Sequence, residues 1–233
     1  MNVMRLLQNI WKVSILKTII FNFKYFQLKT AILFPVIIYD NVILRKIKGK
    51  IILQEKPKFG TIKIGVKTNR FLTSKDKLIW DMNGGVLIFS NWVALGQSLY
   101  MYIGEKGTVK VGKNTVISGG KNGKLIATNN IQIGNNCRIA ADVEIIDTSF
   151  HYLINTCTND RNEINGRIIV GDNCWIGSHS KIYKNTRIAD FTTIGSNSVT
   201  RKNYGDEKYG VYGGNPAKLI SNGWYRDLAY SDS

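Results

Sequence analysis

The chain has 233 residues, with 32 Lys or Arg against 16 Asp or Glu, so its formal charge is +16. This length allows a sizeable core in one or two domains, and the basic excess predicts an anionic partner. Lys12, Lys17 and Pro35 interrupt the apolar N-terminal stretches, which excludes the roughly 20 apolar residues of a membrane span, and no secretory signal is evident.

Three cysteines, Cys137, Cys157 and Cys174, form no Cys-x-x-Cys pair. This spacing argues against a zinc ribbon or a thiol redox motif. Unpaired thiols are typical of a reducing compartment, so we expect a cytoplasmic protein.

Residues 1–30 have the pattern of an amphipathic helix, with apolar residues recurring at intervals of three and four. Residues 1–50 also hold nine basic side chains and one acid, Asp40. A basic amphipathic helix suits the surface of an anionic membrane, which would make the protein peripheral on the inner face of the cytoplasmic membrane. Such a helix could equally cap the open end of the domain that follows, or do both.

Short strands are expected over residues 31–82, where turns and lysines separate apolar runs and the segments at Phe59 and Ile64 resemble degenerate repeats. From Val86 an apolar residue recurs about every six positions, and residues 119–124 break the register as a loop. The rhythm resumes at Ile133, Ile139 and Ile145.

The period then stops between Ile145 and Val170, which are 25 residues apart. Residues 147–168 are rich in Asn, Thr and Asp, and His151 lies among them. We expect this segment to leave the wall of the domain as an excursion loop.

The clearest pattern covers residues 170–198. Large aliphatic residues and small residues each recur at strict intervals of six: Val170, Ile176, Ile182, Ile188 and Ile194, then Cys174, Ser180, Thr186, Thr192 and Ser198. A helix needs apolar residues every three or four positions and a half-buried strand every two, so a strict six fits neither. It predicts an all-β fold, a parallel β-helix of hexapeptides with aliphatic side chains inside.

The domain boundaries follow. We predict a basic N-terminal segment over residues 1–50, the β-helix over residues 51–220 and a short C-terminal tail over residues 221–233.

Three motifs in order resemble the hexapeptide-repeat acyltransferases, and among them the galactoside, maltose and bacterial surface-polysaccharide O-acetyltransferases. They are IVGDNCWIGS at residues 169–178, IGSNSV at 194–199 and GNPAKLI at 214–220. The resemblance implies a left-handed β-helix, a homotrimer with active sites between neighbouring solenoids, and acetyl-CoA as the acyl donor without a metal. It further implies a sugar or lipid-linked saccharide acceptor, as in O-antigen or capsule synthesis.

His151 stands where the family places its catalytic histidine. Transfer of an acetyl group to a sugar hydroxyl needs a base, because an alcohol is a weak nucleophile until its proton is removed. Imidazole suits that task, with a free pKa of about 6.5. The acids near His151 are Asp147 and Glu163, and either could orient its ring. The second histidine, His179, is expected to be a solvent-facing turn residue.

The resemblance also assigns a donor site. Trp175 occupies the position of an indole at the thioester, and Gly177 and Ser178 could supply a backbone N–H to the oxyanion. Ser178 and Ser196 would meet the pantetheine. Arg201 and Lys202, where relatives often carry Thr-Lys, and Lys218 would face the adenosine phosphate.

Other functions fit less well. The carbonic anhydrases of the same fold need three histidine positions for zinc, and this chain has two histidines. Sugar-amine N-acetylation and a non-catalytic scaffold at the membrane stay open as alternatives. The basic residues gather at the N-terminus rather than in a helix–turn–helix or an aromatic groove, so we expect no nucleic-acid partner.

Overall fold

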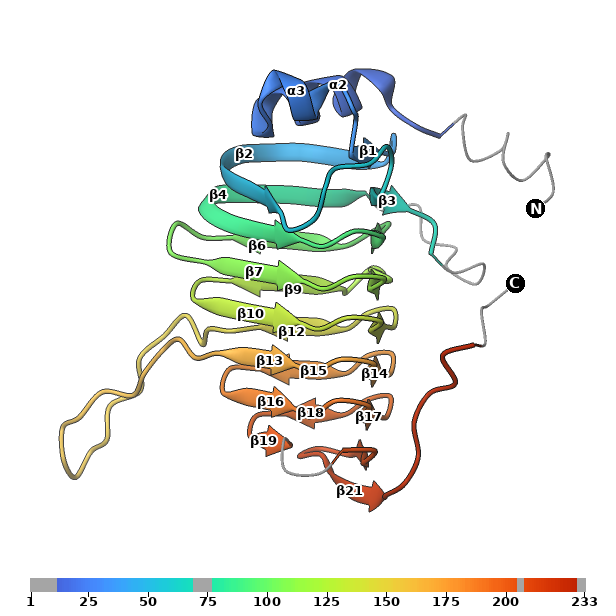
Figure 1. Ribbon diagram of the computed structural model, residues 1–233. Coiled ribbons are helices and arrows are strands. Elements are labelled where there is room, and N and C mark those ends of the chain that lie inside the picture. The colour runs from blue at the N-terminus through green and yellow to red at the C-terminus, as the bar shows by residue number, and fades with distance from the viewer. Residues whose placement is uncertain (1–11, 69–76, 205–207, 230–233) are drawn as a thin grey trace.

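The computed structural model describes residues 12–68, 77–204 and 208–229. In this part the chain winds into a left-handed parallel β-helix, a column with three flat walls (Figure 1). The first wall stacks β1 (Val36–Ile38), β3 (Ile62–Val66), β5 (Val93–Gly96), β8 (Val116–Ile117), β11 (Arg138–Ile139), β14 (Trp175–Ile176), β17 (Thr193–Ile194) and β20 (Val211–Gly213).

The second and third walls share β4 (Leu78–Phe89), whose two halves belong to one wall each. The second continues with β6 (Tyr100–Ile103), β9 (Lys124–Ala127), β12 (Glu144–Ile146), β15 (Lys181–Tyr183) and β18 (Val199–Thr200). The third continues with β7 (Thr108–Val111), β10 (Asn130–Ile133), β13 (Ile168–Val170), β16 (Thr186–Ile188) and β19 (Asn203–Tyr204).

Aliphatic side chains fill the column, as the six-residue period predicts. Ile139, Ile176 and Ile194 lie in register on successive strands of the first wall, and each is at most 1% exposed. Burying such a side chain contributes about 1.5–3 kcal/mol. The small residues that follow four positions later are buried as well, and the Ser180 hydroxyl donates to the Gly195 carbonyl at 2.8 Å. The β-helix predicted from the sequence is therefore confirmed.

The corners repeat with the same period. The same corner position has a φ between 57° and 65° in five successive hexapeptides: Asn173, His179, Asn185, Phe191 and Asn197. Asparagine tolerates this left-handed conformation better than most residues, which explains its recurrence at the turns. His179 thus occupies a regular corner position.

Two of the early strands are longer than the short strands expected over residues 31–82. β2 (Val42–Leu53) pairs with β4 along its whole length, and both strands bend where later coils have a corner. Gly49 has a φ of +105°, and a Cβ on it would lie 2.3 Å from the Gly85 carbonyl oxygen. Glycine therefore lets these strands turn without a loop.

Helices close the N-terminal end of the column (Figure 1). Within the described residues the expected helix comprises α2 (Ile15–Tyr25) and α3 (Leu28–Ala31), and residues 1–11 lie outside them. Asn22 bonds both the N–H and the carbonyl of Val36, and Thr18 bonds those of Ile38. Two helix side chains thereby satisfy the open edge of β1, which would otherwise offer unpaired backbone groups.

The column starts earlier than the boundary expected at residue 51. β1 at Val36 already pairs with β3 in parallel, and residue 51 falls inside β2. The segment at Ile64, which resembles a degenerate repeat in the sequence, therefore belongs to the continuous stack of coils.

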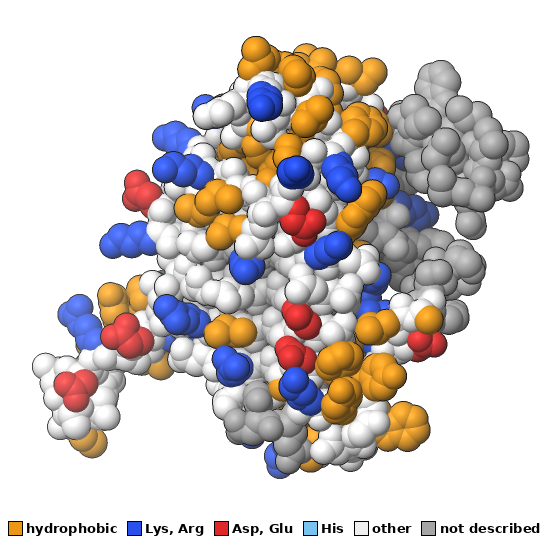
Figure 2. All heavy atoms as spheres, in the orientation of Figure 1, with side chains coloured by type: hydrophobic (Ala, Val, Ile, Leu, Met, Phe, Trp, Pro, Cys, Tyr) orange, Lys and Arg blue, Asp and Glu red, His pale blue; other side chains and the backbone are white. Residues whose placement is uncertain are grey.

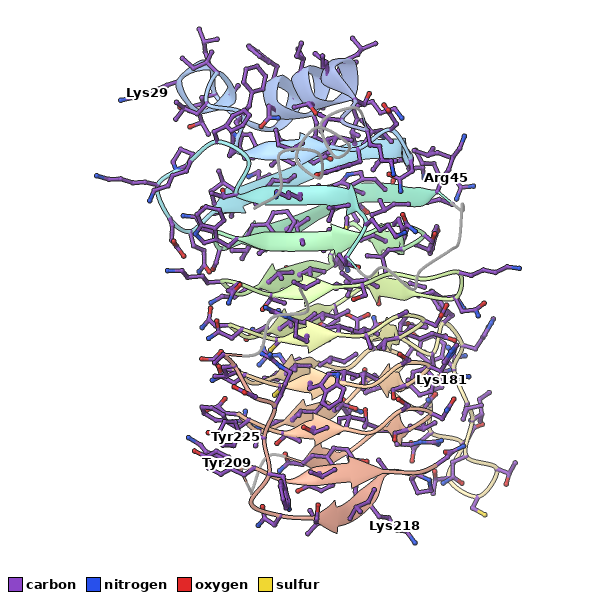
Figure 3. All side chains as sticks on the ribbon, turned by 90° about the vertical axis from the view of Figure 1, so that its right-hand side faces the viewer. Lys29, Arg45, Lys181, Tyr209, Lys218 and Tyr225 are labelled. Atoms are coloured by element: carbon purple, nitrogen blue, oxygen red, sulfur yellow. The ribbon has the colours of Figure 1, made fainter. Side chains whose placement is uncertain are left out.

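The C-terminal end is closed by β21 (Lys218–Ser221), which pairs with β20 in antiparallel orientation. The tail then turns back along the column, and the Arg226 guanidinium donates to the Asn136 carbonyl at 2.9 Å. Tyr225 packs against Phe191 and Tyr209, with ring centroids 5.8 Å apart in both pairs, which places the tail beside the last coils (Figure 3).

Candidate functional site

A two-stranded arm leaves the column between β12 and β13, at the corner where the second and third walls meet (Figure 1). It comprises residues 147–167, and isolated bridges join Thr148 to Asn165 and Ile154 to Arg161. We call this corner the arm corner. The arm occupies the interval in which the six-residue period is interrupted, and it carries His151.

Asp147 anchors the root of the arm. Its carboxylate is fully buried, and it accepts hydrogen bonds from the backbone N–H groups of Thr128 and Asn129, each at 2.8 Å. Burial raises the pKa of the Asp147 carboxyl, and these hydrogen bonds oppose that rise. The Thr128 hydroxyl donates to the Asn165 side chain at 2.8 Å, which ties the returning strand to the same place. Both carboxylate oxygens are thus engaged by the coil above, not directed at His151.

Lys184 holds the arm from below. Its ammonium donates to the Ser149 hydroxyl at 3.1 Å, to the Ile164 carbonyl at 3.3 Å and to the Glu163 carbonyl. Lys184 follows β15 at the arm corner, one coil below the root. Its contacts with both strands fix the direction in which the arm leaves the column. No sequence motif marks Lys184, because its partners, one hydroxyl and two backbone carbonyls, lie 20 to 35 positions away.

His151 lies on the outgoing strand of the arm and is exposed. The Ser149 hydroxyl donates to the His151 carbonyl at 3.1 Å, and Phe150 between them has a φ of +60°. Within the described part of this single chain, no ion pair joins the His151 ring to a carboxylate. Glu163, the second acid considered for that role, is exposed.

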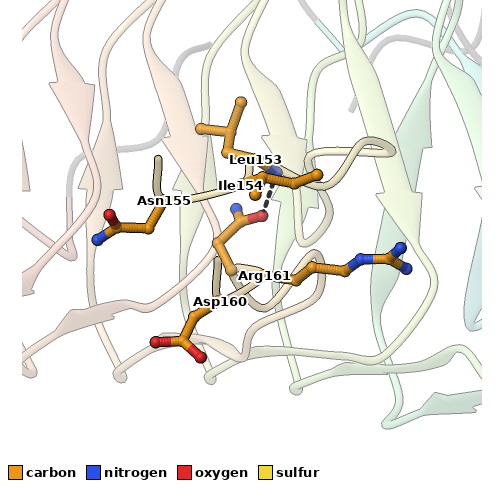
Figure 4. Close-up of a pocket in the computed structure, with 6 residues that line it drawn as sticks. Leu153, Ile154, Asn155, Asp160 and Arg161 are labelled. Carbon is orange, nitrogen blue, oxygen red and sulfur yellow. Dashed lines mark hydrogen bonds between the residues drawn. The ribbon is translucent and has the colours of Figure 1, made fainter. Parts of the chain in front are cut away.

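The arm has apolar side chains that its own chain does not cover. Phe150, Leu153 and Ile154 are 55%, 71% and 56% exposed. Figure 4 shows an open hollow at the tip, lined by Leu153, Ile154, Asn155, Asp160, Arg161 and Asn162. Every lining residue belongs to the arm, so this hollow is separate from the walls of the column.

The residues expected at the donor site lie on another side of the column. Trp175 is 44% exposed and points outward from β14, in register with Arg138 and Thr193 on the neighbouring strands. Ser178 and Ser196 follow β14 and β17 at the corner between the first and second walls. In Figure 1 the first wall faces away from the arm. One chain therefore does not bring His151 and Trp175 together.

Gly177 has a structural reason to be glycine. A Cβ on it would lie 2.5 Å from the Ser196 nitrogen, so the stacking of successive coils requires a close approach here. The Ser178 carbonyl accepts the Asn197 N–H at 2.9 Å, and the Ser178 side chain is half-buried.

The expected cations occupy two places. Arg201 and Lys202 are exposed and follow β18 at the arm corner, and the Lys202 ammonium lies 5.6 Å from the Tyr204 ring centroid. Lys218 is exposed on β21, at the C-terminal end of the column (Figure 3). Arg201 and Lys202 thus lie at a different corner of the column from Ser178 and Ser196.

His179 is exposed, as expected, but it also has a neighbour that the sequence analysis did not identify. Its Nε2 lies 3.9 Å from an Asp142 carboxylate oxygen. The two residues precede Ile145 and Ile182 by three positions each, and those isoleucines are in register on β12 and β15. Counting hexapeptide positions across the excursion would have predicted this pair.

Among the described residues, no group of three or more His, Cys, Asp or Glu side chains gathers in a way that could hold a metal ion. No helix in the described ranges is long and apolar enough to cross a membrane.

Comparison with known proteins agrees with the architecture. A family model described as "Bacterial transferase hexapeptide (six repeats)" matches residues 167–202. Chloramphenicol acetyltransferase of Klebsiella aerogenes is 38% identical over 55 residues, which is 24% of this chain and only 25% of that protein. Among solved structures, the polySia specific acetyltransferase NeuO has a TM-score of 0.56 at 20% identity, over 83% of this chain and 91% of its own.

A hexapeptide-repeat containing acetyltransferase from Vibrio cholerae O1 biovar eltor, solved with acetyl coenzyme A, aligns with a TM-score of 0.45 at 20% identity. That alignment covers 53% of this chain and 64% of the other. The repeat and the fold together define the class: this is a hexapeptide-repeat β-helix protein. The chain carries the bacterial transferase hexapeptide, and its fold is that of the hexapeptide-repeat acyltransferases, which confirms the resemblance.

Proposed function

We propose that this chain is an acetyl-CoA-dependent O-acetyltransferase that acts on a sugar hydroxyl of a surface polysaccharide or its lipid-linked precursor. The proposal is supported by relatives that are themselves acetyltransferases, one of them specific for polysialic acid. It is carried by one observation: the arm holds His151 away from its own column on a doubly anchored root.

The position of the arm favours a site shared between chains. The apolar residues Phe150, Leu153 and Ile154 are exposed on the arm. Exposed apolar side chains that lie together are typical of a surface that contacts another protein chain. Trp175 lies on the first wall of the same column, which faces away from the arm. In a closed ring of three copies, the arm of one chain reaches the first wall of the next, and His151 then faces a neighbour's Trp175. The active unit is thus a homotrimer.

The chemistry follows from the residues present. His151 accepts the proton of the sugar hydroxyl as its oxygen attacks the thioester carbonyl. The resulting oxyanion is stabilised by a backbone N–H near Gly177 and Ser178. The carbon–sulfur bond then breaks, and the coenzyme leaves as a thiol after taking the proton from His151. The product is the O-acetyl sugar, and His151 returns to its starting state.

The direct test measures thiol release from acetyl-CoA in the presence of saccharide acceptors, including amino sugars. His151→Ala should lower the turnover by about 10²–10⁴-fold. The matched control is His179→Ala, which removes the other histidine and should retain most of the activity. Equal losses in both variants, or no thiol release with any acceptor, would reject the proposal. Release only with amino sugars would favour N-acetylation.

Mixing two inactive chains tests the shared site. His151→Ala and Trp175→Ala chains should each be weakly active alone. Reassembled together at random, about a quarter of their interfaces combine an intact His151 with an intact Trp175. Recovery of about a quarter of the wild-type activity is the expected result. Absence of any recovery from properly mixed trimers would place the whole site in one chain.

A further inference from the structure

The outward face of α2 and α3 is an apolar surface that no other described part of the chain covers. We call it the cap face. In Figure 2 apolar side chains gather over these helices at the N-terminal end of the column. Its exposed members are Ile15, Leu16, Ile19, Ile20, Phe23, Leu28, Ile32 and Leu33, and Ile15 and Leu16 are 74% and 68% exposed.

The other face of α2 is already used. Phe21 is fully buried and packs edge-on against Trp80 at 4.9 Å, while Thr18 and Asn22 bond the edge of β1. The helix cannot rotate to bury its outer residues without losing these contacts. The cap face therefore stays outward in the folded chain, and a contiguous apolar surface of this kind marks a contact with something else.

Charge identifies the partner. Lys12, Lys24 and Lys29 are exposed around these helices, and residues 12–39 contain no Asp or Glu. A fourth lysine, Lys17, is bound to the carbonyls of Asp40 and Val42 at 2.7 and 2.8 Å. An apolar centre with a basic rim complements a surface that is anionic outside and apolar beneath.

We infer that the cap face docks on an anionic phospholipid bilayer. α2 lies flat across the end of the column, so its axis would run along the membrane plane with its outer residues in the headgroup region (Figure 1). With 11 residues α2 is far too short to span the bilayer. A second copy on the same face would set lysine against lysine, with Asp40 the one acid beside them in the sequence from Lys12 to Arg45, which disfavours self-association there.

This inference goes beyond acyl transfer and does not depend on it. The experiment is cosedimentation of the full-length protein with vesicles of phosphatidylcholine alone or with added phosphatidylglycerol. Binding is expected to the anionic vesicles and to weaken sharply when salt rises from about 0.05 to about 0.5 M. It should be much weaker on phosphatidylcholine alone.

Matched variants separate the two contributions. Lys24→Gln with Lys29→Gln should weaken anionic binding by about fivefold per lysine. Lys106→Gln with Lys121→Gln, two exposed lysines away from the cap, should change it far less. Leu16→Glu with Ile20→Glu should weaken binding about tenfold or more, because apolar contact is lost and two negative charges are introduced. Trp224→Glu with Leu228→Glu introduces the same two charges on tail residues that are 68% and 43% exposed, and it should retain binding.

Thermal unfolding and size-exclusion chromatography of each variant show whether it is folded and whether its oligomeric state has changed. If the wild-type protein ignores anionic vesicles at low salt, the inference is overturned. It is also overturned if folded cap variants bind as well as the wild type. A change in oligomeric state without lipid, at unchanged vesicle binding, would assign the face to a second copy and overturn it too.

Discussion

The ammonium of Lys184 lies 3.1 Å from the hydroxyl of Ser149, which joins two coils across the arm corner. The same group binds backbone carbonyls of the returning strand at Glu163 and Ile164. One side chain therefore connects both strands of the arm to the column. His151 lies two residues from Ser149, so its position depends on this connection.

Replacing Lys184 by Met should loosen the arm without unfolding the column. Hydrogen bonds from a charged donor contribute about 1.5–3 kcal/mol, so amides of residues 149–164 should exchange about 10- to 150-fold faster. Hydrogen exchange followed by mass spectrometry measures this directly. Lys184→Arg, which keeps the charge, is the control and should show a smaller increase. Unchanged exchange in Lys184→Met would mean that the root alone holds the arm.

Asp147 should make stability depend on pH in an unusual direction for a carboxylate. Burial raises the pKa of its carboxyl in the folded chain above the unfolded value of about 3.9. Its contribution is therefore fully present below that unfolded value and is lost as the pH rises through the raised pKa. The stability difference between wild type and Asp147→Asn should shrink as the pH rises above about 4.

Urea unfolding at several pH values measures this difference. Asp160→Asn, an exposed carboxylate on the arm, is the control for general effects of removing an acid. A difference that grows with pH would contradict the direction stated for the Asp147 pKa.

Asn22 should be essential to the N-terminal end. Asn22→Ala leaves the N–H and carbonyl of Val36 without their partner, at about 1–3 kcal/mol for each buried group left unpaired. We expect the free energy of unfolding to fall by about 2–4 kcal/mol, measured by denaturant titration. Gln27→Ala, an exposed change just beyond α2, should be nearly neutral. Equal effects of the two substitutions would show that Asn22 does not close the edge of β1.

Two glycines in the same hexapeptide position provide a matched pair. A Cβ at Gly177 would lie 2.5 Å from the Ser196 nitrogen, whereas a Cβ at Gly195 would meet its nearest neighbour at 3.4 Å. Gly177→Ala should therefore destabilise the protein by about 1–3 kcal/mol, and Gly195→Ala by clearly less. Thermal unfolding of both variants decides. A Gly177→Ala protein of normal stability that has lost coenzyme binding would instead assign Gly177 to the donor site.

The column could be predicted because its signal is local and repeated. The walls are predicted by aliphatic residues six positions apart, such as Ile176, Ile182 and Ile188. The turns are predicted by asparagine at corners such as Asn173 and Asn185. Each coil repeats the evidence of the one before. The length of strands β2 and β4 was not predicted, because Gly49 and Gly85 allow a strand to continue where an ordinary repeat would turn.

The surroundings of His151 were less accessible from sequence. The excursion was expected because the period fails there, but the geometry of its root depends on residues distant in the chain. Asp147 was considered a partner for His151, and its bonds to Thr128 and Asn129 arise from coil stacking instead. The contact between His179 and Asp142 was hidden because the arm adds residues between two equivalent corners. Such contacts follow from register, which composition does not reveal.

The regular stacking of coils also fixes distances along the column. Neighbouring strands are separated by about 4.8 Å, so the number of coils between α2 and the arm sets the reach of His151 from whatever surface the cap face touches. Inserting or removing one coil of about 18 residues would move that reach by the same small step while leaving each layer intact. The number of layers therefore sets the distance between the cap face and the arm.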